Sequence, residues 1–92
     1  MQHCQRISTD DFERLAGTLT MERMVRHKIV VDENTPYTVL AQLDSYLAEG
    51  CADIYYVAPP PHPAFEAKTA YYFASDRDFQ CIMRIIQGEH TQ

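Results

Sequence analysis

Histidine and cysteine are the residues of this chain best suited to metal binding or nucleophilic catalysis, and they are widely spaced. Structural zinc sites use pairs of these ligands that lie a few residues apart, as in C-x-x-C. No pair with that spacing occurs among the histidines and cysteines, which are His3, Cys4, His27, Cys51, His62, Cys81 and His90. The sequence therefore indicates no metal site and no cofactor.

The cysteines and the paired carboxylates also lack the surroundings of a catalytic group. Cys51 follows Gly50 at the end of an expected helix, where the negative end of the helix dipole disfavours a thiolate. Cys81 lies in the middle of another expected helix, beside core positions. Asp76 and Asp78 are explained by the preference for acidic residues in the first turn of a helix. We therefore expect that the protein is not an enzyme.

The charge and length of the chain restrict its class. Its 92 residues, of which 46% are apolar, suit one domain, 1–92. The net charge of −5 disfavours binding to nucleic acid or anionic membranes, because both need clustered cations. An acidic surface suits a basic partner or simply keeps the protein soluble. No apolar run reaches the roughly 20 residues that span a bilayer, and the first residues lack the apolar middle of a signal peptide. We expect a cytoplasmic protein with reduced thiols.

Helix-start residues followed by apolar positions at helical spacing occur three times. The first helix is short and starts in the cap cluster 8–11. The second covers about 36–49, with Thr35 as N-cap and Gly50 as a left-handed terminal residue. The third starts at Ser75–Asp78, and its core positions are Phe79, Ile82, Met83 and Ile86.

β-Branched and aromatic runs predict three strands, and a fourth is expected near the N-terminus. The three runs cover about 24–32, 53–58 and 68–74, and residues 2–7 form the short first strand. The loop 59–66 carries four prolines, which cannot donate hydrogen bonds to a ladder. We expect this loop to be stiff and extended, so that it either ends a hairpin or presents a preformed binding shape.

These elements follow the order (β)-α-β-α-β-β-α along the chain. Three or four antiparallel strands then face the apolar stripes of two or three helices. The arrangement is an α+β two-layer sandwich, ferredoxin-like in the broad sense.

Two tyrosine pairs in the expected hairpin are the most unusual part of the composition, in which six of 92 residues are tyrosines. Neighbouring strand residues point to opposite faces, and Asp53 and Lys68 are expected to point to water. By alternation Tyr55 and Tyr72 then lie together on the open face, as an aromatic patch that suits a protein interface. Ordinary cross-strand packing is the alternative, and the acidic balance disfavours stacking on single-stranded nucleic acid. The face toward the helices carries Ile54, Tyr56, Thr69, Tyr71 and Phe73.

Charged residues at both ends of the 24–32 segment are the other candidate contacts. Arg26 and Lys28 share one face of the expected strand and suit an acidic protein or an RNA backbone. Asp32 and Glu33 form the negative end of the same segment. Alternatively, the basic residues keep a strand edge from aggregating.

The chain resembles the short acidic proteins that phages encode against host defence systems, and it is most similar to the anti-CRISPR proteins that target type I surveillance complexes. Small size, acidic balance, an α+β domain without catalytic residues and the strand-to-helix ending Tyr-Tyr-Phe-Ala-Ser-Asp-Arg-Asp-Phe at 71–79 carry the resemblance. It implies a non-enzymatic inhibitor in the host cytoplasm. Such an inhibitor binds Cas subunits and blocks access of target DNA or recruitment of the nuclease.

The sequence offers six candidate contacts for such an inhibitor: Tyr55, Tyr72, Arg26, Lys28, Asp32 and Glu33. Among them, Arg26 and Lys28 are candidates for a contact with the guide-RNA backbone. We expect a monomer that does not bind membranes. The alternative hypothesis is a ferredoxin-like regulatory module that dimerises through its sheet and binds a small ligand.

Overall fold

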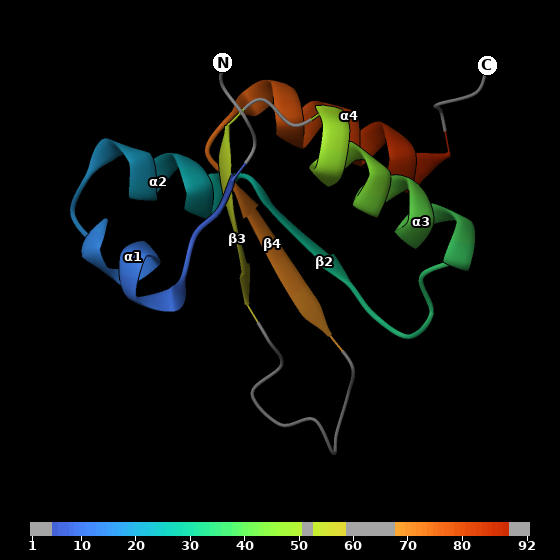
Figure 1. Cartoon of the computed structure of the whole chain (residues 1–92), viewed down its shortest axis with the longest axis horizontal. Coiled ribbons are helices and arrows are strands. Elements are labelled where there is room, and N and C mark those ends of the chain that lie inside the picture. The colour runs from blue at the N-terminus through green and yellow to red at the C-terminus, as the bar shows by residue number, and fades with distance from the viewer. Residues whose placement is uncertain (1–4, 51–52, 59–67, 89–92) are drawn as a thin grey trace.

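A four-stranded mixed sheet forms the centre of the fold, and helices lie on both of its sides (Figure 1). The computed structural model describes residues 5–50, 53–58 and 68–88. β1 is parallel to β3, while the pairs β3–β4 and β4–β2 are antiparallel. In their spatial order the strands are β1 (Gln5–Arg6), β3 (Ile54–Ala58), β4 (Thr69–Phe73) and β2 (Lys28–Val31).

Four α-helices and one π-helical turn complete the part of the fold that the structure describes. Figure 1 places α1 and α2 on one side of the sheet and α3 and α4 on the other. The predicted α+β class is confirmed, although the sheet is mixed and the order is β-α-α-β-α-β-β-α, with one helix more than predicted. The helical elements are α1 (Thr9–Arg14), α2 (Leu19–Arg26), α3 (Tyr37–Ser45), the π-turn η1 (Tyr46–Gly50) and α4 (Asp76–Gln87).

The sheet and the helix pair α3–α4 form a two-layer sandwich with the larger apolar core between them. Ile82 of α4 and Leu43 of α3 are fully buried there together with Phe73 of β4. The apolar stripe predicted for α4 is confirmed, because the same core also holds Phe79, Met83 and Ile86.

A second, smaller core lies on the opposite face of the sheet, beneath α1 and α2. Met24 of α2 is fully buried there. The ring of Phe12 from α1 stacks on Tyr56, with ring centroids 4.1 Å apart and 11° between the ring planes. The hydroxyls of Tyr56 and Thr9 are hydrogen-bonded at 3.0 Å. These contacts hold α1 and α2 against β3 and β4.

The segment predicted as one strand, 24–32, divides into the end of α2 and the shorter strand β2. Thr18 caps the start of α2 with its hydroxyl, and Gly17, with φ of 86°, separates this helix from α1. The sequence predicts a strand from about residue 24, but the helix continues to Arg26 because it buries Met24 in the second core. Only the β-branched run forms a strand, as β propensity favours.

The helices α3 and α4 start near the positions predicted from the sequence, but the cap predicted for α3 is wrong. The predicted start of α4 within Ser75–Asp78 is confirmed, and Ser75 is its cap, with its hydroxyl accepting the N–H of Asp78 at 3.3 Å. The cap of α3 is Pro36, which makes no side-chain capping bond. Thr35 does not cap this helix, because its hydroxyl accepts the N–H of Asp32 at 3.0 Å. The predicted proline loop, 59–66, lies outside the described residues.

Candidate functional site

The register between β3 and β4 places the two candidate tyrosines on opposite faces of the sheet. Tyr55 pairs with Phe73 and packs against the core under α3 and α4. Tyr72 pairs with Tyr56 and packs against the core under α1 and α2. The predicted aromatic patch of Tyr55 and Tyr72 is therefore wrong. Tyr55 points to the other face of the sheet from the one inferred by placing Asp53 in water.

The residues predicted to share one helix-facing side are also divided between the two cores. Tyr71 and Phe73 face α3 and α4, as expected. Ile54 and Tyr56 face α1 and α2 instead. The prediction assumed one open face, whereas both faces carry helices in the part of the chain that the structure describes.

The register of β2 brings Lys28 beside Tyr72. They are cross-strand partners, and the Lys28 ammonium lies 5.6 Å from the centroid of the Tyr72 ring, a cation–π contact worth about 0.5–1 kcal/mol at an exposed site. The next cross-strand row on this face consists of Val30, Ala70 and Ala58. We call the surface formed by both rows the open sheet face; it consists of Lys28, Val30, Ala58, Ala70 and Tyr72.

Helices α1 and α2 leave much of the open sheet face accessible to solvent. Val30 keeps 49% of its surface exposed, and Lys28 is also exposed. Ala58 and Ala70 are half-buried, and their small side chains make this row shallow. Tyrosine beside exposed apolar area is typical of protein interfaces. The open sheet face is therefore the first candidate functional site.

The other predicted contacts lie outside the open sheet face. Arg26 is the last residue of α2 rather than a strand residue, and its guanidinium lies 3.9 Å from the carboxylate of a glutamate one turn earlier. Asp32 follows β2, and its carboxylate accepts the N–H of Asn34 at 2.9 Å. Glu33 is exposed in the same turn. The acidic pair thus lies at one end of β2 and Lys28 at the other.

A second candidate site centres on Asp78, which the sequence explains only as a residue of a helix first turn. This carboxylate is fully buried. It accepts a 2.7 Å hydrogen bond from the Tyr46 hydroxyl and a 3.1 Å bond from the Asp53 N–H. The three residues come from α4, η1 and the segment before β3. Asp78 therefore ties together three parts of the chain.

The π-turn η1 sets the position of Tyr46 beneath α4. A Cβ atom added to Gly50 would lie 3.0 Å from the ring of Tyr46, so glycine allows the close approach of the backbone to this ring. The left-handed conformation predicted for Gly50 is wrong, because the positive-φ glycines of the described chain are Gly17 and Gly88. π-Turns are frequent at functional sites, so the surface beside η1 is considered as a candidate catalytic or binding site.

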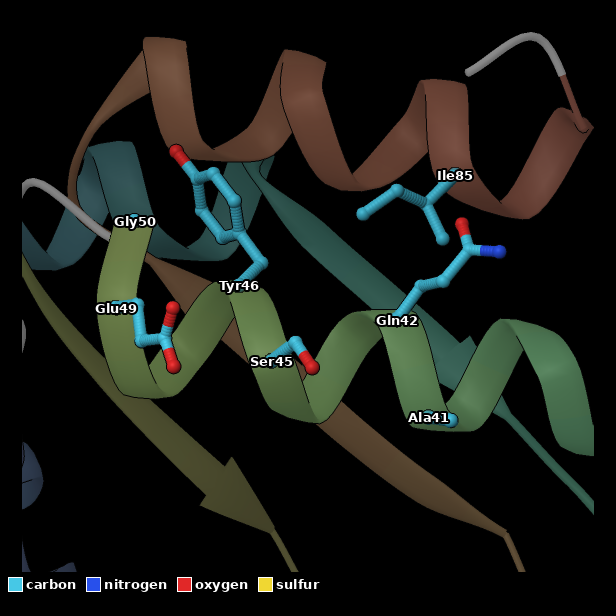
Figure 2. Close-up of a pocket in the computed structure, with 7 residues that line it drawn as sticks. All are labelled: Ala41, Gln42, Ser45, Tyr46, Glu49, Gly50 and Ile85. Atoms are coloured by element: carbon cyan, nitrogen blue, oxygen red, sulfur yellow. The ribbon is translucent and has the colours of Figure 1, made fainter. Parts of the chain in front are cut away.

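A surface groove of about 600 Å³ runs between α3–η1 and α4. Figure 2 shows the Tyr46 ring and the Gln42 side chain reaching from α3–η1 toward α4. Burial, followed by the hydrogen bond to Asp78, raises the pKa of the Tyr46 hydroxyl well above its usual range. A tyrosine that stays protonated and already donates to a carboxylate is a poor proton acceptor at neutral pH. We therefore assign the Tyr46–Asp78 pair a structural role. The groove is lined by Ala41, Gln42, Ser45, Tyr46, Glu49, Gly50 and Ile85.

Tyr71 adds a pH dependence to the stability of the larger core. Burial is the main cause that raises the pKa of Tyr71, and the Asp44 carboxylate adds to it. The fold therefore favours the neutral phenol. This contribution to stability is fully present below the unfolded pKa of about 10 and is lost as the pH rises through the higher pKa of the folded state. We expect the free energy of unfolding, measured with urea, to fall above about pH 10. The fall should be smaller in Tyr71→Phe; an equal fall in both proteins would contradict this assignment.

Comparison with known proteins assigns no family to this chain. No family model matches it, and no curated protein or solved structure is significantly similar. None of the helices that the structure describes has the length and hydropathy that a bilayer crossing requires. Among the same residues, no three histidine, cysteine or acidic side chains are placed to hold a metal ion. The function is therefore argued from the surface of the molecule.

Proposed function

We propose that this protein is a non-enzymatic protein-binding domain whose contact surface is the open sheet face. The observation that carries the proposal is Val30, an apolar side chain with 49% of its surface exposed beside the Lys28–Tyr72 pair. Full burial of such a side chain is worth about 1.5–3 kcal/mol, so a partner that covers the exposed half gains on the order of 1 kcal/mol at this residue alone.

The shape of the open sheet face suits a protein better than a small ligand. Ligand sites are concave and bury most of the ligand. The row of Val30, Ala70 and Ala58 instead carries small or short side chains across three strands, which leaves it shallow. A partner of this surface is expected to bring a flat or gently curved element of its own.

The specific partner that we propose is a Cas subunit of a type I CRISPR surveillance complex. The support is the resemblance of the chain to phage anti-CRISPR proteins in size, acidic balance and absence of a catalytic motif. Bound through the open sheet face, the protein would block DNA binding or recruitment of the nuclease. A contact of Lys28 with the guide-RNA backbone is the alternative to a contact of this side chain with the bound protein, because Lys28 is exposed on the same surface.

Replacing Val30 with lysine is expected to weaken binding to a purified type I surveillance complex at least about tenfold, because it adds a charge beside Lys28 in a desolvated contact. The fold should remain intact, since Val30 is half exposed. Leu19→Lys is the matched control: Leu19 is 75% exposed on α2 and lies outside the open sheet face. Equal loss of binding in both variants, or in neither, would contradict the assignment.

The regulatory-module hypothesis makes a different prediction for the oligomeric state. A module that dimerises through its sheet would give a tight dimer that responds to a small ligand. The proposed inhibitor is a monomer in the absence of its partner. Size-exclusion chromatography with light scattering separates the two, and a tight, ligand-sensitive dimer would exclude the inhibitor.

A further inference from the structure

The outer edge of β2 is open over a short length. Among the residues that the structure describes, β2 is the last strand of the sheet order and pairs with β4 alone. The Phe73 N–H donates to the His27 carbonyl at 3.1 Å. In an antiparallel ladder every second residue bonds to the same neighbour, so His27, Ile29 and Val31 bond to β4. The backbone N–H and C=O groups of the residues between them, Lys28 and Val30, point away from the sheet.

A turn closes this edge directly after β2. The Asp32 N–H donates to the Thr35 hydroxyl at 3.0 Å, and the Asp32 carbonyl accepts the Thr35 N–H at 3.0 Å. Within the described ranges, no hydrogen bond uses the outward backbone groups of Lys28 and Val30. Unpaired groups in a row are what an extended chain needs in order to join a sheet.

The side chains along the open edge carry a pattern of charge. Lys28 and Val30 alternate with the buried Ile29 and Val31, so they are a positive and an apolar position along one side of the strand. The negative Asp32 begins the turn that follows. No carboxylate within the described residues forms an ion pair with Lys28. Side chains that face one another on neighbouring strands lie about 5 Å apart, close enough for opposite charges to attract. The edge therefore selects the chemistry of a strand placed beside it.

We propose that the partner contributes an extended segment that adds to the sheet beside β2. This segment places a carboxylate opposite Lys28 and an apolar side chain opposite Val30, and a cation beyond them lies near the Asp32 carboxylate in the turn that ends the edge. The inference rests on the proposed function and specifies the partner of the same surface. The added strand satisfies the outward backbone groups, and its apolar side chain covers the exposed part of Val30.

A short capped peptide tests the pairing directly. Its sequence carries glutamate, valine and lysine in alternation with threonine, to match the pattern along β2. In an NMR titration of the full chain, the amides of Lys28 and Val30 are expected to shift and to become protected from solvent exchange. The amides of Ile29 and Val31 already bond to β4 and should keep their protection. No binding, or shifts confined to another surface, would mean that the charges only guard the edge against aggregation.

Val30→Pro and Val30→Ala form a matched pair for the backbone contact. Proline removes the outward N–H of Val30, which an edge strand tolerates because this group does not bond to β4. Alanine also shortens the side chain but keeps the N–H. The peptide affinity of Val30→Pro is expected to be at least about tenfold lower than that of Val30→Ala, because the ring removes one edge hydrogen bond and blocks close approach. Equal affinities would overturn strand addition.

Lys28→Glu provides a second test that leaves the backbone unchanged. With an acidic residue at both ends of the edge, the variant is expected to bind the glutamate–valine–lysine peptide more weakly than the wild type does. It should prefer a peptide in which lysine replaces the glutamate. An unchanged preference would overturn the proposed pairing of charges.

These variants also separate this inference from the proposed function. If Val30→Lys loses the surveillance complex while Val30→Pro and Val30→Ala bind it equally, the open sheet face is the contact and strand addition is wrong. If the peptide binds at the edge of β2 but the wild-type protein does not bind the complex, strand addition stands and the proposed partner is wrong.

Discussion

Replacing Ile82 with aspartate is expected to unfold the domain. Ile82 is fully buried at the centre of the core between the sheet and the α3–α4 pair. The substitution loses about 1.5–3 kcal/mol of side-chain burial, and burying an unpaired carboxylate costs several kcal/mol more. The sum is comparable with the roughly 5–10 kcal/mol that stabilises a domain of this length. Circular dichroism together with urea denaturation measures the result.

Gln80→Asp is the matched control for this substitution. Gln80 lies on the same helix but is exposed, so its replacement is expected to change the free energy of unfolding by no more than about 0.5 kcal/mol. An Ile82→Asp protein that melts near the wild-type temperature would mean that this side of α4 does not face the core.

Replacing Asp78 with alanine is expected to lower the free energy of unfolding by about 2–5 kcal/mol. The buried carboxylate accepts hydrogen bonds from the Tyr46 hydroxyl and the Asp53 N–H, and both donors lose this acceptor in the variant. The loss also loosens η1 and the segment before β3 from α4. Urea denaturation near neutral pH measures the change.

Two further variants show whether the effect of Asp78→Ala comes from the loss of its buried hydrogen bonds. Asp76→Ala removes an exposed carboxylate from the same helical turn and is expected to cost no more than about 1 kcal/mol. Tyr46→Phe removes only the phenolic donor, and its effect should not add fully to that of Asp78→Ala, because the two share one hydrogen bond. If Asp78→Ala costs no more than Asp76→Ala, the buried network does not hold the elements together.

Local sequence signals predicted the parts of the fold that depend on near neighbours. The helix-start residues Ser75–Asp78 and the apolar spacing after them predicted α4 correctly, because both signals lie within one helix. The β-branched residues of β2 and the apolar stripe of α3 were predicted for the same reason. The boundary between α2 and β2 was not predicted. It depends on the burial of Met24 of α2 against residues that are distant in the sequence, such as Tyr56.

Strand phase illustrates why the predicted patch failed. Alternation shows which residues of one strand share a face, but not which face meets which helix. Tyr55 and Tyr72 lie on different strands, so their relationship is set by the register, which pairs Tyr55 with Phe73. The register also places Lys28 beside Tyr72, two candidates that belong to separate segments of the sequence.

The buried site required information that no local pattern contains. Two hydrogen-bond donors to the Asp78 carboxylate, Tyr46 and Asp53, lie 32 and 25 residues away along the chain. A carboxylate in the first turn of a helix is usually explained by the helix dipole, so the sequence alone provides no reason to expect that Asp78 is buried. Of the six predicted contacts, the structure places Lys28 and Tyr72 together, and Asp32 beside Glu33 at the far end of β2.

The open sheet face is expected to bind a protein, and affinity capture with quantitative mass spectrometry tests this binding most directly. Wild type, Val30→Lys and Leu19→Lys are each used as bait in cells that carry a type I CRISPR system. We predict that Cas subunits are retained by the wild type and by Leu19→Lys, and are depleted at least about tenfold with Val30→Lys. Cas subunits captured equally by all three baits, or absent from the wild-type sample, would contradict the account.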